Sequence, residues 1–343
     1  MESAQDQNLA AREQALVNWL RHATDLQTVS IQAMPGDASM RRYFRLRTGS
    51  QSYVAMDAPP PRENCQPFVA IARAIQSLGL TSPDIIAADS EQGFLVLTDF
   101  GDQTYLKVLN AKNADRLYQN AMQALSILQT CREVPGRVIP PFTREFMRQE
   151  WSWHQEWFLE KWLGLSLEKN SQVLTSIYEL LVETAASQPQ VFMHRDFHSA
   201  NLMVLPGDDK NSVGILDFQD AFMGPVTYDL ASLLRDCYID WPAEQVVAWA
   251  LQYRQMLPEL HNVSEKEFLR WFDWMGLQRH LKALMTFARK HVRDHQSAYL
   301  AHVPRTLNYI LSVSARYPEL SLLHAYYADV VMPRAREAAI CVP

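Results

Sequence analysis

The chain lacks the features that would place it in a membrane, among exported proteins or on a nucleic acid. No apolar stretch approaches the roughly 20 residues needed to span a bilayer, and the polar start over residues 1–6 has neither the basic nor the apolar region of a signal peptide. The four cysteines are scattered without metal-ligand spacing, so we expect reduced thiols. A net charge of −6 gives no basic footprint for nucleic acid. We therefore expect a cytoplasmic protein without an obligate protein partner.

The composition of the 343-residue chain is that of an ordinary globular protein, with 48% hydrophobic and 20% charged residues. Its length exceeds the usual single core, so we expect two lobes. The hydrophobic pattern changes once along the chain: up to about residue 100 it predicts mostly short strands, and beyond that it is overwhelmingly helical. This predicts an N-terminal nucleotide-binding lobe over residues 1–100 and a C-terminal lobe over residues 101–343. In the first lobe we expect a helix over 9–20, strands over 29–33, 43–46 and 53–56, a helix over 66–78, and two strands ending near Thr98.

The segment from His194 to Asn201 reads His-Arg-Asp-Phe-His-Ser-Ala-Asn and matches the catalytic loop of phosphoryl-transfer kinases. In that loop, an aspartate orients the attacking hydroxyl and an asparagine five residues later holds a magnesium ion. We therefore expect Asp196 to be the catalytic residue and Asn201 to be a metal ligand. Asp217 ends the apolar run 213–216, which predicts a short buried strand, and is placed where a second Mg²⁺ ligand belongs. The alternative is a His-Arg-Asp turn that merely caps a helix.

The departures from the protein-kinase pattern are as informative as the match. Protein kinases carry Asp-Phe-Gly at the second metal site and Ala-Pro-Glu beyond it. This chain continues from Asp217 as Asp-Phe-Gln-Asp, with no room for a long activation loop before the next helical pattern. The triplet at 99–101 does read Asp-Phe-Gly, but it precedes the catalytic loop and is therefore in the wrong order for metal. We interpret it as the hinge between the lobes, with Thr98 and Phe100 at the nucleotide base.

The phosphates of ATP are expected at the turn over 36–39, where Gly36 lets backbone N–H groups approach and the hydroxyl of Ser39 adds a donor. A kinase-like third strand normally carries a lysine for these phosphates, but residues 54–57 read Val-Ala-Met-Asp, with Asp57 in the lysine position. We therefore expect Arg42 or Arg45 to neutralise the phosphates instead. Strand alternation puts the two on opposite faces, so only one of them can fill the role. The alternative is a pseudokinase that has lost nucleotide binding.

Six stretches of the chain carry a resemblance to known proteins: 36–45, 56–60, 97–102, 194–236, 276–282 and 304–305. They resemble the aminoglycoside phosphotransferase and choline kinase superfamily and, within it, the bacterial anomeric N-acetylmuramate/N-acetylglucosamine kinases, over most of the chain. The resemblance implies an α+β, two-lobed, protein-kinase-like fold with a small antiparallel sheet in the N-terminal lobe and a mainly helical C-terminal lobe. It also implies Mg²⁺-dependent transfer from ATP to the C1 hydroxyl of an amino sugar during cell-wall recycling. The aspartate in place of the third-strand lysine is shared with that family.

Three residues are candidates for contacts to the substrate. His198 lies two residues beyond the base, Glu150 lies in an aromatic segment and can pair with a hydroxyl or amide, and Arg235 could meet a lactyl carboxylate. Pairing of Arg235 with Asp229 or Asp236 is the structural alternative. We interpret His194 and Asp229 as structural support for the catalytic loop.

Two further interpretations concern the aromatic segment and the substrate class. Trp153 and Trp157 have helical spacing and are expected in the core. Another small-molecule kinase of the same fold, acting on an aminoglycoside, choline or another alcohol, remains an alternative. Polycationic substrates call for carboxylates around the site, whereas the C-terminal half is rich in cations: Arg279, Lys282, Arg289, Lys290 and Arg293. The sequence leaves open which of the two amino sugars is preferred.

Overall fold

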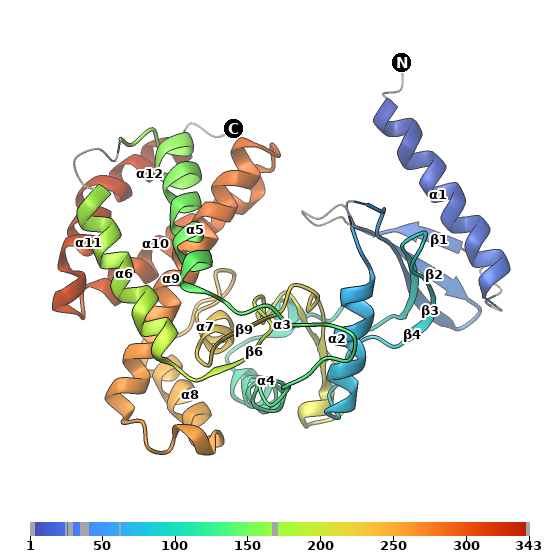
Figure 1. The fold of residues 1–343 in the computed structure, drawn as a ribbon, viewed down its shortest axis with the longest axis horizontal. Coiled ribbons are helices and arrows are strands. Elements are labelled where there is room, and N and C mark those ends of the chain that lie inside the picture. Colours follow the sequence, from blue (N-terminus) through green and yellow to red (C-terminus); the bar gives the residue numbers. More distant parts are fainter. Residues whose placement is uncertain are drawn as a thin grey trace.

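The computed structural model describes residues 4–24, 26, 30–34, 41–61, 63–166 and 171–340. Gly36 and Ser39, expected at the phosphates, lie outside the described residues. A sheet with two helices forms one end of the molecule, and a cluster of helices forms the other (Figure 1). The fold is therefore α+β and two-lobed, as predicted.

The N-terminal lobe contains a five-stranded antiparallel sheet in the order β1-β2-β3-β5-β4. Within the hairpin of β2 and β3, Tyr43 pairs with Met56 and Arg45 pairs with Val54. The turn between these strands contains Gly49 at a φ of +57°, a conformation that glycine adopts without the steric penalty of a Cβ. The strands are β1 (Ser30–Ala33), β2 (Arg42–Thr48), β3 (Gln51–Asp57), β4 (Ile85–Asp89) and β5 (Phe94–Thr98).

Two helices cover opposite faces of this sheet. The helix α1 (Ala4–Ala23) packs Leu16 and Trp19 against a face that includes Phe44 and Ala55. The helix α2 (Gln66–Ser77) packs on the other face, which includes Met56. Because successive residues of a strand point to opposite faces, each side chain of β2 and β3 faces either α1 or α2, and only the α2 face borders the site described below.

Two short antiparallel strand pairs hold the catalytic loop at the base of the C-terminal lobe. Strand β6 (Gln190–Met193) pairs with β9 (Phe222–Pro225), and β7 (Leu202–Val204) pairs with β8 (Val213–Ile215). The predicted loop connects β6 to β7, and the predicted strand over 213–216 is confirmed as β8. Asp217 follows two residues after β8 ends, in line with the sequence prediction.

The rest of the C-terminal lobe is helical, and its long central helix is α9 (Glu265–Val292). The hydroxyl of Ser264 caps this helix by accepting a hydrogen bond from Glu267 N at 3.1 Å. Arg279 and Lys282 lie three residues apart, on one side of α9. The other helices are α3 (Tyr105–Val108), α4 (Ala114–Leu128), α5 (Arg144–His154), α6 (Ser171–Ser187), α7 (Tyr228–Leu234), α8 (Ala243–Met256), α10 (Val303–Ser314), α11 (Ser321–Tyr326) and α12 (Met332–Ile340). None of the helices in the described ranges is long and apolar enough to cross a membrane.

The aromatic segment departs from its prediction. Trp153 and Trp157 are half-buried, whereas Trp151 and Phe158 occupy the core. The interpretation of Trp153 and Trp157 as core residues was therefore wrong. In α5 the buried residues Met147, Glu150, Trp151 and His154 follow helical spacing, and Trp153 lies beside that stripe. Trp157 lies in the π-helix Gln155–Trp162, where Phe158 and Leu159 are the buried residues.

Candidate active site

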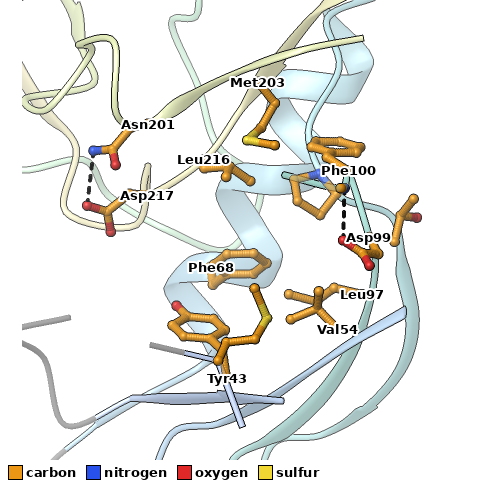
Figure 2. Close-up of a pocket in the computed structure, with 14 residues that line it drawn as sticks. Tyr43, Val54, Phe68, Leu97, Asp99, Phe100, Asn201, Met203, Leu216 and Asp217 are labelled. Atoms are coloured by element: carbon orange, nitrogen blue, oxygen red, sulfur yellow. Dashed lines mark hydrogen bonds between the residues drawn. The ribbon is translucent and has the colours of Figure 1, made fainter. Parts of the chain in front are cut away.

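A cavity of about 230 Å³ lies between the sheet and the C-terminal lobe. Figure 2 shows its labelled lining, with the hinge residues Asp99 and Phe100 on one side and Asn201 and Asp217 on the other. Phe68 from α2 lies between these two ends. The complete lining is Met34, Tyr43, Val54, Phe68, Pro83, Leu97, Thr98, Asp99, Phe100, Gly101, Asn201, Met203, Leu216 and Asp217. The lining is apolar in the middle and polar at the Asn201–Asp217 end, which suits a flat base with a charged tail.

The hinge residues Thr98 and Phe100 both line the cavity where the sequence analysis expects them. The hydroxyl of Thr98 donates to Asp84 Oδ2 at 3.2 Å, and Gly101 N donates to Asp99 Oδ1 at 2.9 Å. The ring of Phe100 packs over Gly214, because a Cβ built on that glycine would lie 2.8 Å from the ring. The structure thus places Asp99 in the hinge, well separated along the cavity from Asp217.

The catalytic loop is braced by Asp229, which is buried at the start of α7. Its two oxygens accept hydrogen bonds from His194 N at 2.7 Å and Arg195 N at 2.9 Å. Burial raises the pKa of Asp229 to about 7 although these two N–H donors favour its charged form. The ring of His194 donates from Nε2 to Leu216 O at 3.0 Å, so it ties the loop to the segment that carries Asp217.

Two residues at this site have unusual backbone conformations. Arg195 has a φ of +80° and Asp217 has a φ of +61°. Side chains other than glycine rarely adopt such values, and strained residues of this kind cluster at functional sites because the surrounding structure holds them there. The hydrogen bonds that His194 N and Arg195 N donate to Asp229 supply that restraint for the loop.

Asn201 and Asp217 meet at the polar end of the cavity. Asn201 Nδ2 donates to Asp217 Oδ2 at 3.3 Å (Figure 2). Gln219 Nε2 donates to Asp217 Oδ1 at 2.7 Å. Carboxylate and amide oxygens are ligands that Mg²⁺ accepts, and Mg²⁺ often takes its remaining ligands from phosphates and water. Among the described residues, no group of three or more His, Cys, Asp or Glu side chains gathers as a metal site, so this pair fits a metal ion shared with a nucleotide rather than one held by protein alone.

The carboxylate of Asp196 lies beside two cations from α9. Lys282 Nζ is 3.5 Å and Arg279 Nη1 is 3.7 Å from Asp196 Oδ1. Burial works to raise the pKa of Asp196, but the charges of Lys282 and Arg279 outweigh it and hold this pKa below its usual range. Asp196 is therefore ionised at neutral pH, as an acceptor for a hydroxyl must be.

A small hollow of about 70 Å³ opens at Asp196. His198, expected to contact substrate, lines it. The polar residues Asp236, Arg279, Lys282 and Thr286 and the aromatic residues Tyr238 and Phe287 are also in its lining. Burial raises the pKa of the Cys237 thiol, which also faces the hollow, to about 11, so this thiol stays protonated.

The other two expected substrate residues do not line this hollow. Glu150 is only 3% exposed and lies behind the loop, with Arg195 Nη2 at 3.7 Å from its carboxylate. Burial raises the pKa of Glu150. The buried side chain of Arg235 forms an ion pair with Asp273 and lines a separate surface hollow together with Arg305. The expectation that Arg235 meets the substrate therefore finds no support, and its partner is neither Asp229 nor Asp236.

The structure corrects the position of Asp57. Its side chain is fully buried on the α1 face of the sheet, where it accepts hydrogen bonds from Arg12 and from Arg42, the latter at 2.6 Å from Nη2. The cavity-facing residues of β3 are Val54 and Met56, because Val54 lines the cavity and the two share a face. Asp57 therefore does not occupy the lysine position, and Arg42 is bound to Asp57 on the far side of the sheet from the cavity.

Arg45 is on the cavity side but at the hinge end. Its Nε lies 2.7 Å from Asp99 Oδ2, and its Nη1 lies 2.9 Å from Asp102 Oδ1. Burial works to lower the pKa of Arg45, but its hydrogen bonds to these two carboxylates hold it above the usual value. Arg45 thus links β2 to the hinge, and neither of the two expected arginines lies at the Asn201–Asp217 end.

Several site residues were not identified from the sequence. Gln219 donates a hydrogen bond to Asp217, and Asp236 accepts one from Ser199 N at 2.9 Å. The ammonium group of Lys282 contacts the carboxylate of Asp196. The sequence signals for Lys282 were its place in a cation-rich region and in the stretch 276–282 that carries the resemblance. Neither shows that it meets Asp196, from which 86 residues separate it.

Comparison with known proteins agrees with this geometry. The profile of the phosphotransferase enzyme family matches residues 30–265. An N-acetylmuramate/N-acetylglucosamine kinase from Pseudomonas aeruginosa is 42% identical over 310 residues, with 88% of each chain covered. A kinase of the same name from Neisseria meningitidis is 35% identical over 331 residues, which cover 93% of this chain and 96% of the relative.

Solved structures with the same fold include an ADP-bound aminoglycoside phosphotransferase, at a TM-score of 0.59 and 16% identity, with 88% of this chain and 97% of that chain covered. An ethanolamine kinase from Plasmodium vivax has a TM-score of 0.62 at 12% identity, with 90% of each chain covered. At these identities the likeness is one of fold alone, and it confirms the predicted kinase-like architecture. Since the family profile and these relatives span most of the chain, this protein belongs to the phosphotransferase enzyme family and is an enzyme that transfers phosphate.

Proposed function

We propose that this protein transfers the γ-phosphate of ATP to the C1 hydroxyl of N-acetylmuramate or N-acetylglucosamine, a step that returns cell-wall sugars to metabolism. The observation that carries the proposal is the carboxylate of Asp196 in the lining of the hollow, five residues before Asn201, which lines the nucleotide-sized cavity. The names of the relatives support the choice of sugar, since kinases that are 42%, 40% and 35% identical carry both substrates in their names.

Asp196 acts on the acceptor. A carboxylate that accepts a hydrogen bond from the sugar hydroxyl fixes its orientation. It takes up the hydroxyl proton as the new O–P bond forms and the bond between the γ-phosphorus and the departing ADP breaks. The cations of Lys282 and Arg279 keep this carboxylate charged, and they would stabilise negative charge on a phosphoryl group transferred close to Asp196. The two residues are therefore expected to affect the rate as well as the binding of the substrate.

The nucleotide lies along the large cavity in this proposal. Its base contacts the hinge at Thr98 and Phe100, and its phosphates extend to the end formed by Asn201 and Asp217. These two residues would hold Mg²⁺, which would neutralise phosphate charge at this end of the cavity. Hydrogen bonds from the side chains of Gln219 and Asn201 hold the carboxylate of Asp217 at that end.

The lining of the hollow contains two cations, Arg279 and Lys282, and two carboxylates, Asp196 and Asp236. Arg279 and Lys282 present positive charge, and N-acetylmuramate has a lactyl carboxylate that can meet it. Tyr238 and Phe287 offer aromatic faces on which the C–H surface of a sugar can pack. The ammonium groups of an aminoglycoside would meet these two cations as well as the two carboxylates, so the choice of an N-acetyl sugar rests on the names of the relatives.

An ADP-release assay over a panel of acceptors tests the proposal. We expect turnover with N-acetylmuramate and N-acetylglucosamine, and none above background with choline or kanamycin. The Asp196→Asn variant is the control for contaminating activity, because it should lose turnover with every acceptor. Turnover with choline or kanamycin but not with either N-acetyl sugar would contradict the proposal and favour another small-molecule kinase.

A further inference from the structure

The sheet leaves the phosphate end of the cavity without a cation from the third strand. In β3, every residue of which the structure describes, Val54 and Met56 point to the cavity side and Asp57 points away. Met56 is fully buried and uncharged. A triphosphate carries several negative charges, so a nucleotide in this cavity requires a cation from another element.

Two arginines, one in β2 and one just before it, lie near opposite ends of the cavity. Tyr43 lines the cavity, and by alternation Arg41 and Arg45 share its face. Arg45 is at the hinge end, where it contacts Asp99. Four residues of extended chain cover about 13 Å, so Arg41 lies at the opposite end, toward Asp217.

The surroundings of Arg41 are acidic and partly buried. Its Nε–H donates to Glu63 Oε2 at 3.0 Å, and the two side chains are only 11% and 15% exposed. Burial works to lower the pKa of Arg41, but Tyr43, Glu63, Asp220 and Asp217 outweigh it and hold the pKa above its usual value. The charges of Asp217 and Asp220 act on the guanidinium, so Arg41 lies near the segment that would hold the metal.

We propose that Arg41, oriented by Glu63, binds the phosphates of ATP and together with Glu63 takes the place of the third-strand lysine and its helix glutamate. This inference rests on the proposed use of ATP and assigns a phosphate-binding residue to that site. It replaces Arg42 and Arg45 in the role that the sequence suggested for one of them.

The chemistry of the pair suits this role. The contact to Glu63 uses Nε–H, and a guanidinium carries four further N–H donors in a planar fork that matches phosphate oxygens. Glu63 lies three residues before α2 begins, and Phe68 of α2 packs on Phe218 with ring centroids 4.7 Å apart. The pair therefore connects β2 to the helix that contacts the Asp217 segment, so phosphate binding and the placement of α2 are coupled.

Direct binding measurements without sugar test the proposal. Calorimetric titration with Mg²⁺ and the non-hydrolysable ATP analogue AMPPNP should show about 30-fold weaker binding for Arg41→Gln, the size expected for one charge-assisted contact. Binding of adenosine, which has no phosphates, should change less than about twofold on the same reasoning. Arg41→Lys should recover part of the loss, because an ammonium lacks the planar fork. Glu63→Gln should weaken AMPPNP binding by a smaller factor and leave adenosine binding unchanged, as expected for a positioning residue.

Arg47→Gln is the matched control, because Arg47 is an exposed arginine of the same strand. This variant should bind AMPPNP and adenosine with wild-type affinity. Wild-type affinity of Arg41→Gln for AMPPNP would overturn the proposal. Equal losses for AMPPNP and adenosine would also overturn it, since they would indicate a structural role. Because no sugar is present, these outcomes are independent of whether the acceptor panel supports the proposed substrate.

Discussion

Replacing Asp57 with alanine should destabilise the protein without weakening ATP binding. The carboxylate of Asp57 is fully buried and holds two arginines, Arg12 of α1 and Arg42 of β2. Removing one partner of a buried ion pair costs about 3 to 5 kcal/mol. The two arginines are 23% and 24% exposed, so they regain water when the carboxylate is lost, and we expect a loss near the lower limit, about 3 kcal/mol.

This loss translates into a measurable shift in melting temperature. Unfolding of a chain of this length has an entropy of about 0.7 kcal/mol/K, which makes a loss of about 3 kcal/mol a decrease of about 4 °C. Differential scanning calorimetry measures the shift, and steady-state kinetics measure the KM for ATP, which should stay within about twofold of wild type by the same contact reasoning. Asp102→Ala is the matched control, since Asp102 is 63% exposed and its pair with Arg45 is worth less than about 1 kcal/mol.

The opposite pattern would refute the reasoning. If Asp57→Ala raised the KM for ATP strongly and left the melting temperature unchanged, Asp57 would belong to the phosphate site after all. Asp57→Lys extends the test, because a lysine there would place a third cation against Arg12 and Arg42. We expect it to be less stable than Asp57→Ala, with no gain in ATP binding.

Three further predictions follow from the site and the core. Asp217→Ala should abolish turnover, whereas Asp196→Asn should keep nucleotide binding and lower kcat by about 100-fold or more. Steady-state kinetics combined with nucleotide titration distinguish the two effects. Weakened nucleotide binding in Asp196→Asn with an unchanged kcat would contradict the role of Asp196 as the acceptor for the sugar hydroxyl. Gly214→Ala should raise the KM for ATP, because its Cβ would lie 2.8 Å from the ring of Phe100; an unchanged KM would show that this packing does not shape the base site. Burial lowers the pKa of His154 to about 3, so its contribution to stability is complete above pH 6.5 and is lost as the pH falls. In urea unfolding between pH 6 and pH 4, His154→Gln should therefore lose about 1.4 kcal/mol less per pH unit than wild type, and identical slopes would contradict a buried neutral His154.

The sequence predicted the catalytic loop and the hinge because their signals are local. Asp196, Asn201 and Asp217 have fixed spacings within one strand-loop-strand segment, and the backbone of that segment brings Asn201 and Asp217 together. The hinge followed from an apolar strand that ends at Thr98. Strands and helices of the N-terminal lobe were predicted to within a few residues for the same reason, since periodicity is a local property.

The errors arose where the orientation of a strand or a distant contact decides the outcome. The run Val-Ala-Met-Asp reads like the lysine-bearing strand of kinases, yet the pairing of β3 turns Val54 and Met56 to the cavity and Asp57 to α1. A shift of one residue in such an alignment reverses every side chain. Arg41 was passed over because its partner Glu63 is 22 residues away, and nothing in a single sequence shows that the two meet.

The most direct measurement of the account's central claim is phosphate transfer to N-acetylglucosamine and to its 1-O-methyl glycoside, followed by ³¹P nuclear magnetic resonance of the products. The two acceptors differ only in whether the C1 hydroxyl is free. We predict a sugar 1-phosphate signal with the free sugar, matched by ADP release, and no transfer to the glycoside. Equal transfer to both acceptors, or a product phosphorylated at another hydroxyl, would contradict a kinase that acts at C1.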